Sequence, residues 1–291
     1  MNRANFNLKE VLQIENDTEA ITHSGMFHAD DVFSTALLTL VKPDIKINRI
    51  ARVPDGYKGL VYDIGYGRYD HHQADKRTRE NGIAYAAFGL LWEKIGPALL
   101  GQELSDRIDK SFVEKIDYSD NTGIRNMLST TISEFNPCWD EDKTSDECFF
   151  EAVSFAKRIL ERKINYEISA VRAKKVIYAS LDKSYNRCVL LEKPMPWKDV
   201  LVGTDTEFVI YPSVRGGYIV QTVPRSNDDS TPVIPLPKEW LGKNKSELEK
   251  ISGIASITFC HASGYLAGAE ELGDVWRMID IAKNNTAKMA G

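Results

Sequence analysis

The N-terminal part of the chain alternates between strand-like and helix-like patterns of apolar residues. Residues 20–22 have the apolar character of a buried strand end, and residues 32–41 then repeat apolar positions at helical spacing. Residues 45–50 alternate apolar and polar side chains, and residues 59–65 form a short apolar run bounded by glycines. This order predicts an α/β fold with a parallel sheet, in which ligands bind beyond the carboxyl ends of the strands.

Helical spacing dominates the middle of the chain. It predicts a helix over residues 84–94 that ends at Gly96-Pro97, a second helix over residues 104–116, and one or two long helices between residues 145 and 181. Residues 117–123, which follow the second helix, are acidic and rich in turn formers, so they are predicted to form a loop.

The pattern changes again towards the C-terminus. Strands are predicted at residues 187–191 and 208–211, and a proline-rich span follows from residue 224 to 237. We therefore predict an N-terminal α/β domain of residues 1–182, which includes the linker helices, and a smaller α+β domain of residues 183–291.

Composition narrows the class of protein. The chain has 291 residues, of which 43% are hydrophobic and 27% charged, as in soluble globular proteins. Its formal net charge of -5 argues against a protein that coats duplex nucleic acid, because such binding needs many Lys and Arg side chains. A local basic groove remains compatible with this charge.

Cysteines and the N-terminal segment bear on the compartment. The four cysteines lie too far apart for a CxxC metal site and are too few for a disulfide framework, so we expect them to be reduced. The polar leader of residues 1–17, in which we expect one short helix, lacks the apolar stretch of a signal peptide, and no apolar run is long enough to span a bilayer. These features predict a cytoplasmic protein with no membrane partner.

Histidines gather in two short segments beside carboxylates. Four of the five histidines fall within residues 21–31 and 70–72. His23, His28 and Asp30 lie across a predicted turn from strand to helix, where Gly25 permits an unusual bend. Each histidine taken alone could cap a helix or bond within the core. Together they indicate a site for divalent metals, and two metals a few ångströms apart form a phosphoryl-transfer site.

The second group of candidates begins at the end of a predicted strand. Asp63 follows an apolar run, so its carboxylate is expected either to cap the turn at Gly65 or to be buried and held by a cation. His71 and His72 are adjacent and cannot both point the same way on regular backbone, so one is expected to bind metal and the other to face substrate. Asp70 is the expected partner that orients an imidazole through its other ring nitrogen.

Weaker candidates lie in charged or turn-like segments. Acidic turns after helices are common, so spacing alone supports Asp117 and Asp120 only weakly. Arg77 and Arg79 could contact substrate phosphates, although charged loops are usually only solvated. In the C-terminal half, the small residues around His261 and Ser263 could bind a phosphate or a chain terminus with help from Arg225. The alternative for that segment is a strand-to-helix turn with a structural histidine.

These motifs, in this order, resemble those of the DHH phosphoesterase superfamily. More narrowly, residues 20–285 resemble the melanocyte-proliferating-gene exonuclease family. The matching motifs are THSGMFHAD (22–30), YDHHQ (69–73), NYE (165–167), PWK (196–198), QTVP (221–224), SGI (252–254) and FCHASG (259–264).

The resemblance implies an N-terminal DHH-type catalytic domain with a dinuclear metal centre, usually manganese, and a C-terminal domain that grips substrate. One metal would be held by His23, His28 and Asp63. The ligands of the other would be Asp30, Asp63, His71 and either Asp117 or Asp120. His72 would contact the phosphate. Many superfamily members have Asp at the position of His28, so magnesium, zinc and iron stay open as alternatives to manganese.

The function predicted from these features is a metal-dependent phosphodiesterase, an exonuclease acting on single-stranded RNA or DNA ends. Asp63, Asp70 and His72 would carry the chemistry. Two alternatives stay open: hydrolysis of short oligonucleotides or small phosphoanhydrides by the same centre, and a regulatory protein with a closed structural metal site. The oligomeric state, a homodimer included, is also open.

Overall fold

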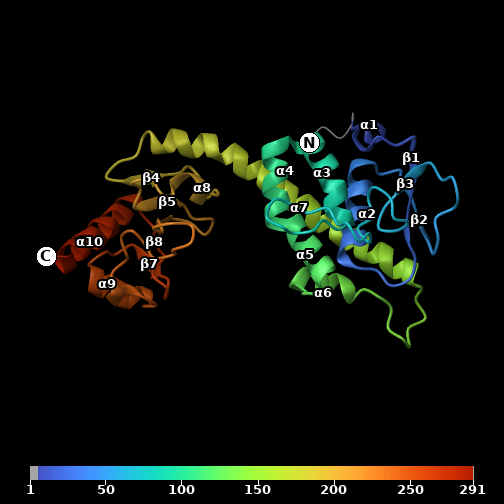
Figure 1. The fold of residues 1–291 in the computed structure, drawn as a ribbon. Helices are drawn as coiled ribbons and strands as arrows, with labels where there is room; N and C mark the ends of the chain where they lie inside the picture. Colours follow the sequence, from blue (N-terminus) through green and yellow to red (C-terminus); the bar gives the residue numbers. More distant parts are fainter. Residues whose placement is uncertain (1–5, 291) are drawn as a thin grey trace. The chain divides into compact units, whose positions relative to one another are not determined.

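The computed structural model describes residues 6–290 and divides the chain into two compact units (Figure 1). The first extends to Ile168 and the second begins at Ser169. Both include part of helix α7 (Ser145–Leu181), which is the long helix predicted from the sequence. The predicted domain boundary lies just beyond the end of α7, whereas the compact units divide within it. Because the helix is continuous at this point, the sequence shows no change in composition that would mark the division.

The first unit is built on a three-stranded parallel sheet, as predicted. The strand order is β2 (Lys46–Ile50), β1 (Asn16–His23), β3 (Gly59–Val61), with β1 parallel to both neighbours. In the register, His23 lies opposite Ile50 and Ile21 opposite Val61. All three strands therefore end at one edge of the sheet, where the loops that carry the candidate ligands begin.

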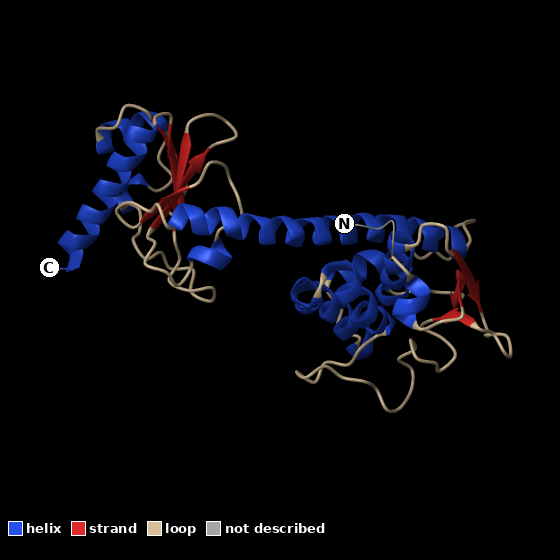
Figure 2. Cartoon of the chain, turned by 90° about the horizontal axis from the view of Figure 1, so that it is seen from above, coloured by secondary structure: helices blue, strands red, loops and turns tan. Residues whose placement is uncertain are grey.

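Helices of the first unit lie mostly to one side of these strands (Figure 2). The short helix α1 confirms the one expected in the polar leader, whose first five residues lie outside the described part. Helix α2 buries nearly all of its side chains in the core that the helices share with the sheet. The helices before α7 are α1 (Leu8–Leu12), α2 (Ala29–Val41), α3 (Ala87–Leu100), α4 (Gln102–Ile108), η2 (Asp109–Val113), α5 (Glu114–Thr122) and α6 (Met127–Ser133).

Two of the predicted helix ends are wrong. Helix α3 continues through Pro97 to Leu100, because Leu99 and Leu100 pack against the core and outweigh the one hydrogen bond that the proline removes. The segment predicted as an acidic loop is helix α5, which follows α4 through the π-helical turn η2 and ends at Gly123, where φ is 71°. Asp117 and Asp120 therefore lie on a helix.

The second unit has a five-stranded mixed sheet. The order is β4 (Cys188–Leu190), β5 (Phe208–Pro212), β6 (Tyr218–Thr222), β8 (Leu266–Ala269), β7 (Ile257–Cys260), in which only the β4–β5 pair is parallel. The predicted strands are confirmed as β4 and β5. Its helices are α8 (Lys198–Leu201), η3 (Lys238–Trp240), α9 (Lys245–Ser252) and α10 (Leu272–Ala290). Within the described residues, every helix is too short or too polar to cross a bilayer.

Candidate metal centre

The strand edge of the first unit delivers two candidate ligands directly. His23 is the last residue of β1, and Asp63 lies two residues beyond β3. Asp63 has a left-handed backbone with φ of 56°, and its N–H donates to the Tyr69 carbonyl at 3.0 Å. Such a conformation is unfavourable for a residue other than glycine and is typical of sites where a side chain must be aimed. Here the residue with this conformation is Asp63, whose carboxylate lies at the centre of the cluster.

The loop that carries His28 is fixed from two sides. Gly25 has φ of 88°, the bend expected at this position, and its carbonyl accepts a 2.7 Å hydrogen bond from Arg49. On the other side, the Asn136 side chain contacts both backbone groups of Phe27, at 3.0 and 2.9 Å. Because both contacts come from distant parts of the chain, the position of His28 depends on the whole fold of this unit.

Helix α2 supplies two carboxylates in its first turn. Asp30 and Asp31 are both fully buried. One oxygen of Asp31 accepts the N–H groups of His28 and Val32, at 2.9 and 2.8 Å, which suits a negative charge at a helix N-terminus. Its other oxygen faces His23. The sequence reading missed Asp31, although its place directly after Asp30 in the same motif was the available signal.

The side chains from these separate segments converge. His23 Nε2 lies 3.2 Å from Asp31 Oδ2 and 3.3 Å from Asp63 Oδ2. His71 links Asp63 to Asp120, with Nδ1 at 3.2 Å from Asp63 Oδ1 and Nε2 at 2.8 Å from Asp120 Oδ2. His28 Nδ1 approaches Asp120 at 4.0 Å. Three stretches that are far apart in the sequence, residues 23–31, residues 63–71 and Asp120, thus meet in one place.

Three groups in this cluster have ligand atoms within 4.8 Å of one another. Asp63 belongs to two of them and so connects these two groups. In the geometry His28 groups with Asp30 and Asp120, whereas the resemblance paired it with His23 on the first metal. The groups are His23, Asp31 and Asp63; His28, Asp30 and Asp120; and Asp63, Asp70, His71 and His72.

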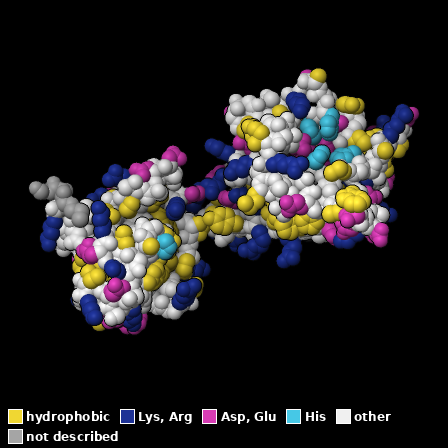
Figure 3. Space-filling view, turned by 90° about the horizontal axis from the view of Figure 1, so that it is seen from below, with side chains coloured by type: hydrophobic (Ala, Val, Ile, Leu, Met, Phe, Trp, Pro, Cys, Tyr) yellow, Lys and Arg dark blue, Asp and Glu magenta, His cyan; other side chains and the backbone are white. Residues whose placement is uncertain are grey.

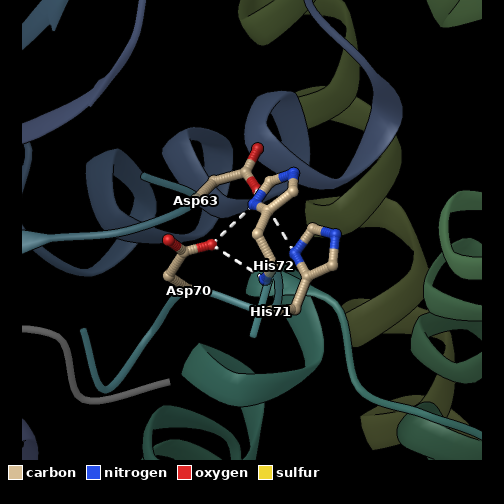
Figure 4. Close-up of side chains that lie close together, drawn as sticks. All are labelled: Asp63, Asp70, His71 and His72. Atoms are coloured by element: carbon tan, nitrogen blue, oxygen red, sulfur yellow. Dashed lines mark hydrogen bonds and ion pairs between the residues drawn. The ribbon is translucent and has the colours of Figure 1, made fainter. Parts of the chain in front are cut away.

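His71 and His72 differ in exposure, although their rings lie side by side. His71 is buried, whereas the His72 side chain is 55% exposed, and the two rings stack with centroids 4.3 Å apart. One oxygen of Asp70 lies 2.6 Å from His72 Nδ1 and also accepts the His72 backbone N–H (Figure 4). An ionised carboxylate can only accept, so Nδ1 carries the proton and Nε2 is left for another partner.

Buried polar atoms at this centre lack hydrogen-bond partners. Among the described residues these include both carboxylate oxygens of Asp30, Oδ2 of Asp31, Oδ1 of Asp63 and Nδ1 of His71. Several of these atoms lie close to one another without hydrogen-bonding geometry, as ligands do when they point at a common ion. Buried carboxylates are unfavourable unless paired or bound to a metal, so the donor set fits divalent cations.

Crowding of charge shifts the pKa values in this cluster. Burial would lower the pKa of His23, but Asp31 and Asp63 outweigh it and raise that pKa to about 10. Burial also opposes protonation of His71, whose pKa Asp120 and Asp63 nevertheless raise to about 9. Burial and the neighbouring carboxylates raise the pKa of Asp30 well above its ordinary value. Without metal, protons therefore provide part of the positive charge that the carboxylates require.

These shifts predict a pH dependence of metal binding. With pKa values of about 10 and 9, His23 and His71 carry protons at pH 7 and must lose them to bind a metal. The affinity for Mn²⁺ should therefore rise between pH 6 and pH 8, by up to about tenfold per pH unit for each proton released. Calorimetric titration in buffers of different ionisation enthalpy counts these protons. Binding that releases none would contradict the assignment of these histidines as ligands.

Asp117 and Arg79 lie apart from this cluster. Arg79 forms two hydrogen bonds with Asp109 and one with Asp117, each at 2.7 Å. Asp117 is fully buried and also accepts the N–H of Gly89 at 3.1 Å. The predicted substrate contact by Arg79 is not supported, because its side chain is buried and its Nε and Nη2 atoms bond Asp109 and Asp117. Of the two candidates on α5, Asp120 reaches the histidines and Asp117 does not.

The other predicted substrate contacts have mixed positions. Arg77 pairs with Glu93 at 2.5 Å and remains half exposed. In the second unit, His261 Nδ1 accepts the Ser263 N–H at 3.1 Å in the turn between β7 and β8, so this turn does not lead into a helix. Ser263 lines a cavity of about 400 Å³, whereas Arg225 and His261 do not.

A cavity of about 650 Å³ opens onto the cluster of candidate metal ligands. Figure 3 shows histidines of the first unit grouped on one face. His23, Asp63 and His72 line the cavity, together with Arg52 and Tyr66, two residues that the sequence reading missed. Both follow strand ends, since Arg52 lies two residues after β2 and Tyr66 five residues after β3. Position at the strand edge was the only signal that could have indicated them.

Comparison with known proteins identifies related chains. The model of the MYG1 exonuclease family, described as an uncharacterised protein family (UPF0160), matches residues 19–282. MYG1 exonuclease from Rattus norvegicus is 28% identical over 304 residues, which cover 85% of this chain and 80% of the relative. The Homo sapiens MYG1 exonuclease is 28% identical over 305 residues, covering 85% and 81%. MYG1 protein YER156C from Saccharomyces cerevisiae is 27% identical over 322 residues, covering 90% and 94%. No solved structure matches the chain.

Proposed function

Because the chain belongs to the MYG1 exonuclease family, we propose that it is a metal-dependent phosphodiesterase. It would remove nucleotides from the ends of single-stranded nucleic acids and would prefer RNA to DNA. Membership confirms the family resemblance seen in the motifs. The wider DHH superfamily, a pair of metal ions and manganese as their identity are parts of the proposal. The observation that carries it is the cluster of buried, unpartnered carboxylate oxygens beneath an open cavity.

The proposed ligands follow the geometry of the cluster. His23, Asp31 and Asp63 would hold one divalent ion, and Asp30, Asp120 and a histidine the other, with Asp63 between them. Divalent ions bound there would lower the pKa of water and offset the charge of a phosphate. His28 and His71 both reach Asp120, so either imidazole can complete the second set.

Protein side chains outside the ligand set would orient the phosphate. Asp70 fixes the His72 ring by accepting its Nδ1–H, and the exposed Nε2, when it also carries a proton, would donate to a phosphate oxygen or to the leaving oxygen. Arg52 forms no ion pair with any residue that the structure describes, so its guanidinium is free to bind a second phosphate at the cavity wall. Loss of the Asp70 contact would free the orientation of the His72 ring and would no longer hold its proton on Nδ1.

The cavity favours catalysis over a purely structural metal site. A structural site is saturated by protein ligands, whereas this cluster faces an open space of about 650 Å³. That volume lies within the range of about 300–1,000 Å³ found for small-ligand sites and suits one or two nucleotides. Hydrolysis of short oligonucleotides by the same centre is therefore the second candidate.

A substrate panel tests the proposal. Single-stranded RNA and DNA, labelled at the 3′ or the 5′ end, are incubated with the protein and each divalent metal in turn. We expect stepwise shortening from one end that requires metal, with Mn²⁺ most effective. Activity confined to inorganic pyrophosphate would replace the proposal with phosphoanhydride hydrolysis. Metal binding without hydrolysis of any substrate would favour a regulatory protein.

A further inference from the structure

Tyr66 is an exposed aromatic residue at the wall of the catalytic cavity. It is 74% exposed, and it lines the same cavity as His23, Asp63 and His72. No aromatic ring or cation packs on it among the residues that the structure describes. The ring is therefore largely open to solvent, and its apolar faces are available to a ligand.

Backbone contacts hold Tyr66 in an unfavourable conformation. Its φ is 55°, in the left-handed region that non-glycine residues rarely adopt, and its N–H donates to Asp70 Oδ2 at 2.6 Å. The other oxygen of Asp70 holds the His72 ring. One carboxylate thus fixes both the exposed tyrosine and the histidine expected to meet the phosphate. A strained residue tied to the catalytic machinery indicates a functional position.

We propose that Tyr66 is the stacking platform for the nucleobase that adjoins the scissile phosphate, an inference that rests on the proposed function. A phosphate near His72 and the metal cluster leaves its nucleoside in the remainder of the same cavity, where Tyr66 forms part of the wall. Stacking of a base on an aromatic side chain contributes about 1–3 kcal/mol and is tolerant of sequence, because every base has a π-face. The site would therefore take single-stranded ends of any sequence.

The test combines removal of the ring with removal of the base. We compare the wild-type protein with Tyr66→Ala and Tyr66→Phe on a short single-stranded RNA. The same RNA is also tested with an abasic residue at the last nucleotide of the degraded end, and then at the second-to-last. We expect Tyr66→Ala to lower kcat/KM about 5- to 150-fold, mainly through KM, and Tyr66→Phe to change it little. Removing the base should weaken wild-type hydrolysis similarly, and Tyr66→Ala should cause no further loss on that abasic RNA.

Trp139→Ala is the matched control. Trp139 is 96% exposed in the same unit but does not line the cavity, so its loss should leave kcat/KM unchanged. A 2-aminopurine at the terminal position reports stacking directly: its fluorescence should be quenched by the wild-type protein and by Tyr66→Phe, and not by Tyr66→Ala.

The outcomes distinguish failure of the stacking site from failure of the proposed function. If the wild-type protein degrades RNA and tolerates the abasic residues at both positions without loss, the stacking site is wrong and the proposed function stands. This comparison uses only the wild-type protein, so it holds even if Tyr66→Ala fails to fold. Equal losses for Tyr66→Ala on normal and abasic RNA would also overturn the stacking site. A wild-type protein that degrades no oligonucleotide would overturn the proposed function.

Discussion

Replacing Asp63 with asparagine is expected to abolish metal-stimulated hydrolysis while the fold remains intact. Asp63 lies between the two imidazoles, 3.3 Å from His23 and 3.2 Å from His71, and belongs to two of the three candidate ligand groups. The carboxylate is the bridging ligand of the proposed centre, and asparagine keeps its shape but removes its charge. Outer partners of metal ligands already contribute about 10- to 100-fold to affinity or activity, so losing a shared ligand should exceed about 100-fold.

Folding should depend much less on this charge. Burial disfavours the charge of Asp63, but contacts with His23 and His71 outweigh it and lower the pKa of Asp63 to about 2, so asparagine should cost some stability. That cost is partly offset because the neighbouring carboxylates of Asp30 and Asp31 no longer face a third negative charge. Mn²⁺ binding by calorimetry, hydrolysis of labelled RNA and urea unfolding are measured on the same preparation. Asp55→Asn is the matched control, since Asp55 is exposed and lies outside the cavity. Full manganese-stimulated activity in Asp63→Asn would refute the bridging role.

Local patterns along the sequence predicted the parallel sheet correctly. Apolar strand-like runs that alternate with helical segments are typical of α/β folds with a parallel sheet, and the carboxyl ends of such strands are the predicted position of both His23 and Asp63. Their convergence follows from the register, because Ile21 lies opposite Val61 and His23 and Asp63 each follow two residues later. This part of the site was predictable because it depends on secondary structure alone.

Side chains whose roles depend on tertiary packing were not predictable in the same way. Arg79 resembles a solvated loop residue in the sequence, yet its side chain is buried against Asp109 and Asp117. Asp117 fits there because residue 89 is glycine, and a Cβ at that position would collide with its carboxylate. Tyr66 is prominent only because its turn projects into the cavity. Neither a buried ion pair nor an exposed ring has a periodic pattern that the sequence would reveal.

Asp120→Asn and Asp117→Asn are expected to have opposite consequences, although the two residues lie three positions apart on α5. Asp120 contacts His71 at 2.8 Å and groups with His28 and Asp30, so its replacement should weaken metal binding and lower activity by more than about 100-fold. The free energy of unfolding should change little, because the Asp120 side chain is partly exposed and contacts histidines of the candidate metal centre rather than the hydrophobic core. Asp117 has no contact with the histidines.

Asp117→Asn should instead destabilise the fold. The two carboxylate oxygens accept from Arg79 and from the Gly89 N–H, so an asparagine must turn its NH2 group towards one of these donors. This unpaired contact outweighs the relief of a buried charge and should lower the free energy of unfolding by about 1–3 kcal/mol. Burial raises the pKa of Asp117 to about 7 against the opposing effect of Arg79, so the comparison belongs at pH 8, where the carboxylate is ionised. Urea unfolding and Mn²⁺ titration of both variants distinguish the two roles. If Asp117→Asn loses metal at full stability while Asp120→Asn keeps it, the assignment of the ligand on α5 is reversed.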